Sequence, residues 1–274
     1  MAEISILLVG STDRAEFREA RAVLDGLGRV VVAAEIKSAT CALASGVVVP
    51  DVIVVAQSYP GQFPPEVVDR LRRLAPLARL LGLLGSWCEG ETRTGQPWPA
   101  AIRIYWHEWL PRVEPEFALL REGECSTLAL PVTAGEEERL LLLADRPLTR
   151  REGLVAVSTP QLEMYGWLAT ACARHGYSSV WLQPHRAVRV EGAIAAIFDA
   201  GECRGEEIES LADLAVALGP APIIALLDFP RVEDRSRALA AGARAVLSKP
   251  VLIGDLFWQI DRISYPPAHA AFSR

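Results

Sequence analysis

The chain has 274 residues, of which 51% are hydrophobic and 23% charged, and its 28 Lys and Arg against 34 Asp and Glu give a net charge of −6. This length predicts two domains of about 110 to 130 residues each. Because the net charge is negative, the sequence shows no excess of basic residues that would bind phosphate groups, and we expect neither nucleic acid nor an anionic membrane as a partner. Charged residues follow the first apolar run, and no segment reaches the roughly 18 uncharged residues of a membrane span, which predicts a cytoplasmic protein without a signal peptide.

In the first half, short apolar runs alternate with amphipathic segments, as in βα units on a parallel sheet. The predicted strands are 4–9, 30–34, 52–56 and 79–84, and the predicted helices are 13–27, 36–45 and 64–74. The stretch GSWCEGETRTGQPWPAAIRIYWHEW (85–109) follows, and its glycines and prolines exclude a regular fourth helix. Its last part, AIRIYWHEW (101–109), alternates as a fifth strand would.

This stretch has three interpretations. Its aromatic and charged side chains could anchor a long loop to the core, or they could form a protein-binding surface, since such residues dominate interface hot spots. In the third interpretation Cys88 is a nucleophile, His107 is its base, and Glu89, Glu91 or Glu108 orients the imidazole. The candidate residues of this loop are Trp87, Cys88, Glu89, Glu91, Arg93, Trp98, Trp106, His107 and Trp109.

A connector separates the halves. Thr133 and Glu136 have the spacing of a capping box, which predicts a helix over about 135–144, and the charged segment 145–153 reads as a linker. The second half then repeats the βα order. Its predicted strands are 154–157, 179–183, 193–198, 223–227 and 245–247, and its predicted helices are 161–175, 206–218, 231–241 and 252–263. The similar ends of the first strands, ILLVGST (6–12) and GLVAVST (153–159), indicate a duplicated domain.

Three segments of the second half carry a family resemblance: AIAAIFDA (193–200), APIIALLDFP (221–230) and ALAAGARAVLSKP (238–250). From 153 to about 263 the chain resembles the receiver domain of bacterial response regulators, an α/β fold that accepts a phosphoryl group on an aspartate. The resemblance implies that Asp199 occupies the phosphorylation position and that Lys249 contacts the phosphoryl group. Lys249 is one of only two lysines in a chain with 26 arginines, which is consistent with a use for a compact point charge.

The departures from the family bear on the chemistry. Receivers carry two acidic residues after the first strand to hold Mg²⁺, and this chain has Ser158 and Thr159 there. Leu227 replaces the switching hydroxyl at the end of the fourth strand. Glu202 and Asp228 are possible replacement carboxylates. We therefore expect no cofactor, with Mg²⁺ bound only if Asp199 is phosphorylated.

The first half resembles a receiver only in outline. Ala56 occupies the phosphorylation position and Gln57 follows it, Ser11 and Thr12 stand where the acidic pair would be, and no Lys-Pro closes the fifth strand. We expect that this copy takes no phosphoryl group.

The last predicted helix suggests a contact between copies of the chain. Its apolar side chains share one face, whereas Trp258 points nearly the opposite way. This surface is the usual dimer contact in receivers, so a homodimer through Trp258 is one expectation. Cover by the tail or by the first domain is the other.

Together these observations predict an α/β protein with two flavodoxin-like, doubly wound parallel five-stranded sheets in tandem. The expected divisions are a first domain at 1–112, a connector at 113–152, a second domain at 153–264 and a loose tail at 265–274.

The expected function is signalling through contacts with an unidentified signalling protein, without phosphoryl transfer. An atypical regulator phosphorylated on Asp199 is the alternative, and a thiol enzyme using Cys88 is the third reading. The resemblance also leads us to expect no output domain after 263.

Overall fold

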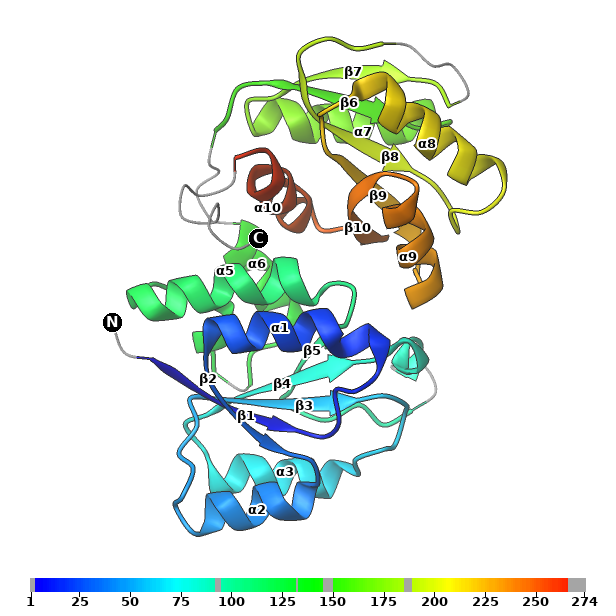
Figure 1. The fold of residues 1–274 in the computed structure, drawn as a ribbon. Coiled ribbons are helices and arrows are strands. Elements are labelled where there is room, and N and C mark those ends of the chain that lie inside the picture. Colours follow the sequence, from blue (N-terminus) through cyan, green and yellow to red (C-terminus); the bar gives the residue numbers. More distant parts are fainter. Residues whose placement is uncertain (1–2, 92–94, 132, 145–149, 185–188, 266–274) are drawn as a thin grey trace. The chain divides into compact units, whose positions relative to one another are not determined.

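The computed structural model describes residues 3–91, 95–131, 133–144, 150–184 and 189–265. The chain divides into two compact units, Met1–Asp145 and Arg146–Arg274. Each unit contains one five-stranded sheet whose strands are all parallel, with helices on both faces (Figure 1). This confirms the predicted fold class. None of the helices in the described ranges is both long enough and apolar enough to cross a membrane.

The first sheet has the strand order β2-β1-β3-β4-β5. The chain passes from β1 to β2 at one edge, and then crosses to β3, β4 and β5 on the other side of β1. Figure 1 shows α1 and α5 on one face of this sheet and α2 and α3 on the other. The strands are β1 (Ile4–Val9), β2 (Gly28–Ala33), β3 (Val52–Gln57), β4 (Arg79–Leu84) and β5 (Ile102–Tyr105). The helices are α1 (Arg18–Leu27), α2 (Ile36–Ala44), α3 (Pro65–Leu74), α5 (Trp109–Glu122) and α6 (Glu136–Ala144), with short 3-10 turns η1 (Ala15–Phe17), η2 (Ser86–Cys88) and η3 (Thr127–Ala129).

Helix α5 corrects the sequence prediction. The strand predicted over 101–109 ends at Tyr105, and a helix begins at Trp109 that the sequence analysis did not expect. Pro111 lies in the first turn of this helix, where an N–H has no intrahelical partner, so it does not oppose helix formation. Trp109, Val113 and Phe117 are each at most 1% exposed, so their burial outweighs the hydrogen bond lost at Pro115.

The segment after α5 also belongs to the first unit. Gly123 adopts the left-handed conformation and ends α5. The buried Glu116 carboxylate of α5 then accepts hydrogen bonds from Ser126 Oγ and Thr127 N, both at 2.7 Å. The predicted boundary at 112 therefore falls inside α5, and the compact unit continues to Asp145.

The second sheet has the strand order β10-β9-β8-β6-β7, the same winding as the first. Its strands are β6 (Leu154–Ser158), β7 (Ser178–Leu182), β8 (Ala193–Asp199), β9 (Ile223–Asp228) and β10 (Ala243–Lys249). Its helices are α7 (Leu162–Arg174), α8 (Glu206–Leu218), α9 (Val232–Ala240) and α10 (Ile253–Ser264).

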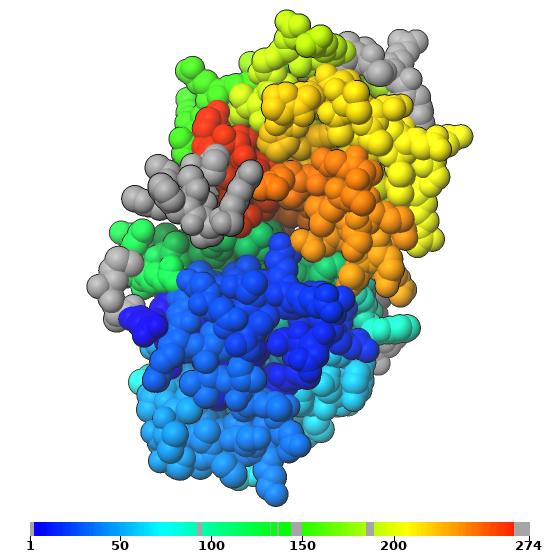
Figure 2. Space-filling model, in the orientation of Figure 1, coloured from blue at the N-terminus to red at the C-terminus, as the bar shows by residue number. Residues whose placement is uncertain are grey.

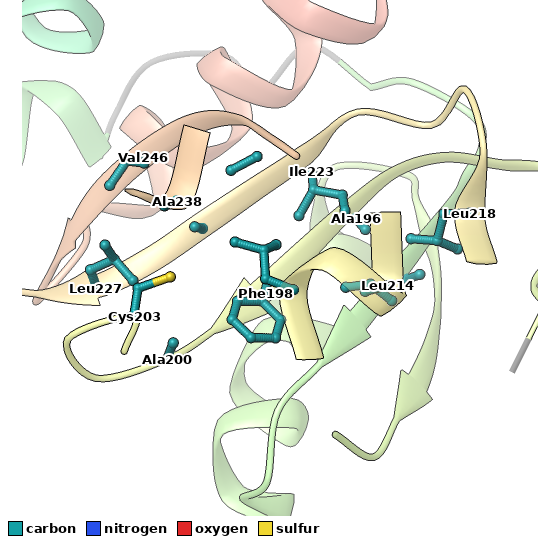
Figure 3. Packing of buried hydrophobic residues seen from close by; sticks show 14 of the residues in the cluster. Ala196, Phe198, Ala200, Cys203, Leu214, Leu218, Ile223, Leu227, Ala238 and Val246 are labelled. Carbon is teal, nitrogen blue, oxygen red and sulfur yellow. The ribbon is translucent and has the colours of Figure 1, made fainter. Parts of the chain in front are cut away.

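Two apolar layers hold the second unit together. One lies between the sheet and helices α8 and α9, where Phe198 packs with Leu214 and Ala238 (Figure 3). The other lies between the opposite face and helices α7 and α10, where Ile197 packs with Leu168 and Phe257. On the surface, α8 and α9 lie next to each other, as the yellow and orange regions of Figure 2 show. These layers fix the strands whose carboxyl ends form the candidate site.

Candidate functional site

The carboxyl ends of β8, β9 and β10 bring three charged side chains together. Asp199, Asp228 and Lys249 are the last residues of these neighbouring strands. The Lys249 ammonium lies 2.8 Å from Asp199 Oδ1 and 3.2 Å from Asp228 Oδ1. Asp199 is buried, whereas the Asp228 side chain is 57% exposed. One cation is therefore shared by two carboxylates. The sequence indicated Lys249 and Asp228 as candidate site residues, but not that Lys249 pairs with both aspartates.

Thr159 forms a hydrogen bond with the second carboxylate oxygen of Asp199. Its hydroxyl donates a 2.7 Å hydrogen bond to Asp199 Oδ2 and accepts one from Gln161 N at 3.2 Å. Thr159 therefore lies beside Asp199, but the prediction that it caps the helix is wrong, because Gln161 is the N-cap of α7 and the amide that Thr159 binds lies before the first helical turn. Ser158 is also buried, but strand alternation directs its side chain toward the opposite face of the sheet.

Leu227 lies away from Asp199. Its side chain is fully buried in the layer under α8 and α9, beside Cys203 (Figure 3). In the strand pairing, Leu226 is opposite Asp199, and successive side chains point to opposite faces. The prediction that Leu227 lines the Asp199 pocket is therefore wrong, because its side chain packs in the core on the other side of the sheet.

The electrostatics of the site favour a charged lysine. Burial lowers the pKa of Lys249, but its hydrogen bonds with Asp199 and Asp228 outweigh burial and raise the pKa overall. Of the two replacement carboxylates considered, Glu202 instead pairs with Arg204 at 2.9 Å. Within the described ranges, no three His, Cys, Asp or Glu side chains are grouped so that they could hold a metal ion.

Glu207 is a residue of this region that sequence reasoning missed. Its carboxylate oxygens accept hydrogen bonds from Gly201 N at 2.7 Å and Cys203 N at 2.8 Å, which ties the turn after β8 to the start of α8. The available signal was an acidic residue in the first turn of a helix, which commonly bonds free backbone amides.

In the first unit, the position near the carboxyl end of β3 that corresponds to Asp199 carries no carboxylate. Ala56 pairs with Leu83 as Asp199 pairs with Leu226, so the register puts an alanine at the acceptor position, as predicted. Gly10, rather than the predicted Ser11 and Thr12, lies next to Ala56: a Cβ on Gly10 would come within 2.9 Å of the Ala56 carbonyl oxygen.

Glu16 fills the nearby space in the first unit. Its side chain is 6% exposed, and Glu16 Oε2 accepts hydrogen bonds from Ser86 N at 3.0 Å and Ser86 Oγ at 2.7 Å. A carboxylate from the loop after β1 thus holds the turn after β4. The sequence analysis assigned Glu16 no role, because its partner lies 70 residues away.

The tryptophan-rich stretch is mostly anchored inside the first unit. Trp98, Trp106 and Trp109 are at most 5% exposed, whereas Trp87 is 62% exposed. Trp98 Nε1 donates a 2.9 Å hydrogen bond to the Phe63 carbonyl oxygen, and its ring lies over Gly82, where a Cβ would approach it to 3.1 Å. Three of the four rings therefore anchor the stretch, and Trp87 remains at the surface. Arg93 lies outside the described residues.

Cys88 belongs to a buried polar network. Its thiol lies 3.4 Å from the Gln57 carbonyl oxygen and 3.5 Å from Gln57 Nε2. The same amide donates to Glu91, which also forms a 2.6 Å ion pair with Arg103. Burial is the main effect that raises the pKa of the Cys88 thiol, and the hydrogen bond from Gln57 offsets it only in part.

His107 is also buried and lies next to Glu89, one of the glutamates that the thiol-enzyme reading assigns to orient it, but Cys88 has a different hydrogen-bond partner from the one that this reading requires. Its ring stacks on Tyr105, and His107 Nε2 lies 3.4 Å from Glu89 Oε1. The hydrogen-bond partner of the Cys88 thiol is Gln57, not His107.

Trp258 on α10 is half-buried, and the Arg262 guanidinium lies 5.5 Å from its ring centre. The neighbouring guanidinium partly covers the ring whose exposure motivated the predicted dimer contact.

Comparison with known proteins finds matches only among solved structures, at low sequence identity and low TM-score. Neither the protein-family models nor the curated proteins contain a match to the chain. The receiver domain of the Francisella response regulator 1452 is 16% identical over 41% of this chain and 96% of its own, with a TM-score of 0.37. A CheY-like receiver domain protein from Methanospirillum hungatei JF-1 is 19% identical over 42% and 94%, with a TM-score of 0.36. A probable two-component system response regulator/GGDEF domain protein is 11% identical over 94% and 97%, with a TM-score of 0.35.

Proposed function

We propose that this chain is a cytoplasmic signalling regulator whose two receiver-like units act through protein contacts, without phosphoryl transfer or any catalytic activity of their own. The observation that carries the proposal is that both carboxylate oxygens of Asp199 are engaged. Oδ1 pairs with Lys249 and Oδ2 accepts the Thr159 hydroxyl. Position 159 thus carries a threonine hydroxyl, whereas a receiver has there a carboxylate that helps to hold Mg²⁺.

The missing carboxylate affects Mg²⁺ binding most. Mg²⁺ prefers six oxygen ligands and is commonly held by one or two carboxylates together with water and phosphate oxygens. Asp199 and Asp228 already share the Lys249 ammonium, so a divalent cation would have to compete with an internal cation. Without bound metal, the charge that develops during phosphoryl transfer is poorly stabilised. We therefore expect weak Mg²⁺ binding and no stable acyl phosphate.

The test is incubation of the full chain with acetyl phosphate and Mg²⁺, followed by intact mass spectrometry. A receiver that retains both acidic residues serves as the positive control. The proposal predicts no adduct of about 80 Da under conditions that modify the control. An adduct that disappears in Asp199→Asn would replace this proposal with the alternative, an atypical regulator phosphorylated on Asp199.

Contacts with a partner protein are best supported at the carboxyl end of the first sheet. Trp87 and Tyr59 are 62% and 54% exposed, on the turns that follow β4 and β3. These turns are adjacent, since a Cβ on Gly85 would lie 3.2 Å from the Ser58 carbonyl oxygen. Exposed aromatic side chains of this kind are common centres of binding energy. The thiol-enzyme reading is less favoured, because the raised pKa of Cys88 disfavours the thiolate that would act as nucleophile.

A further inference from the structure

The outer face of α7 leaves apolar side chains at the surface. Its inner face is held by buried Leu168, Ala171 and Cys172. On the outer face, Leu162 is 59% exposed and Trp167 is 44% exposed. These two side chains are about 140° apart around the helix axis, so they flank the outer face from opposite sides. An exposed tryptophan is a common centre of binding energy at protein interfaces.

Small residues lie between these two side chains on the helix surface. Gly166 is exposed, and nothing lies within 4 Å of where its Cβ would be. Glycine inside a helix destabilises it relative to alanine, and the packing of this unit gives no steric reason for it. The Thr170 hydroxyl donates to the Gly166 carbonyl oxygen at 2.8 Å, so its polar group is satisfied within the helix. The surface beside Trp167 is therefore shallow.

Opposite charges stand at the two ends of the same face. Glu163 and Arg174 are separated by about three helical turns and so point the same way as Trp167. Both are exposed. Among the residues that the structure describes, neither has an ion-pair partner within the chain. A second α7 running antiparallel would place each Glu163 beside the Arg174 of the other copy.

We propose that the outer face of α7 is a homodimer interface in which two copies of this chain pack their α7 helices antiparallel about a two-fold axis. Each Trp167 lies on the shallow surface formed by Gly166 and Thr170 of the other copy, and two Glu163–Arg174 pairs flank the contact. A helix of this length covers less area than a standard interface, so the dimer is weak, with a dissociation constant in the micromolar range. The inference is independent of the phosphorylation state of Asp199.

Charge variants test the pairing in the full chain by sedimentation velocity over about 5 to 500 μM. Glu163→Arg and Arg174→Glu should each raise the dissociation constant by about tenfold or more, because each places like charges in contact. The double charge swap, Glu163→Arg with Arg174→Glu, should return it to within about threefold of the original value. Failure of the swap to restore a dimer that both single variants disrupt would overturn the antiparallel arrangement.

A second variant separates association from folding. Gly166→Gln should keep or raise the Tm, because the site is open and glutamine forms helix better than glycine, yet it should abolish the dimer by filling the shallow surface. The competing surface is tested with Trp258→Glu on α10. Dissociation by Trp258→Glu but not by Gly166→Gln would assign the dimer to α10 and overturn the proposal. A wild-type chain that stays monomeric throughout the concentration range would also overturn it.

Discussion

At the scale of single residues, the ion pair between Lys249 and Asp199 determines what the second site can do. A buried carboxylate is stabilised only when its charge is balanced and its oxygens are hydrogen-bonded. Lys249 and Thr159 meet both conditions for Asp199. The same contacts that stabilise Asp199 therefore reduce its availability for chemistry.

We predict that Lys249→Met destabilises the chain by about 2–3 kcal/mol, somewhat below the cost of breaking a fully buried pair, because the lysine side chain is 19% exposed. The raised pKa of Lys249 sets the pH dependence. A lysine with a raised folded pKa adds stability that is fully present below its unfolded value of about 10.4 and is lost as pH rises through the folded pKa. Denaturant unfolding should show a constant difference from wild type between about pH 6 and 9 and a smaller one above about pH 10.4.

Lys37, the other lysine of the chain, provides the matched control because it is exposed. Lys37→Met should change the unfolding free energy by less than about 0.5 kcal/mol. Equal effects of the two substitutions would contradict a specific role for the Lys249 pair.

The second prediction at this scale concerns Cys88. Because burial raises its pKa, the native thiol should react with iodoacetamide more slowly than the exposed Cys41 and Cys125 at every pH from about 6 to 9. Peptide mass spectrometry of each cysteine measures the rates in one sample. A Cys88 pKa below that of a free thiol, lost in His107→Ala, would instead favour the enzyme reading.

At the scale of elements, the described parts of the tryptophan-rich stretch, 85–91 and 95–109, are anchored by buried rings. Its rings enter the core beside β4 and α5, and the Gln57–Glu91–Arg103 network satisfies the buried charges beneath them. A long loop without regular structure can be ordered in this way because large aromatic rings bury much area with few torsions.

Two tryptophan substitutions in this stretch should differ sharply in cost. Trp98→Ala should destabilise the chain by about 3–5 kcal/mol, because it removes a buried ring and its hydrogen bond to Phe63. Trp87→Ala should cost less than about 1 kcal/mol, because the ring is 62% exposed. Urea unfolding of both variants checks this. A large cost at Trp87 would mean that it too is an anchor.

At the scale of the whole molecule, the chain consists of two units that each contain a complete sheet and its own apolar layers. Units with separate cores can open separately. We therefore predict that Lys249→Met increases hydrogen–deuterium exchange only in peptides from the second unit, and Trp98→Ala only in those from the first. Exchange that rises in both units for either variant would show that they unfold together.

The sequence by itself determined the features that depend on local pattern. The βα alternation predicted two parallel sheets, the similar strand ends indicated the repeat, and the resemblance to receivers implied that Asp199 and Lys249 share a site. The carboxyl ends of parallel strands lie at the same edge of a sheet, and in the order β10-β9-β8 the strands that end in Lys249, Asp228 and Asp199 lie side by side. This is why the site could be predicted in outline.

Tertiary structure alone decided the contacts between residues far apart in the chain. Pro115 lies inside α5 and costs it a hydrogen bond, and the burial of Trp109, Val113 and Phe117 outweighs that cost. The sharing of Lys249 with Asp228, the bond from Glu16 to Ser86 and the exclusion of Leu227 from the pocket likewise depend on register and packing. Local pattern reports which face of an element is apolar, but the partner of each side chain is set by how whole elements pack together.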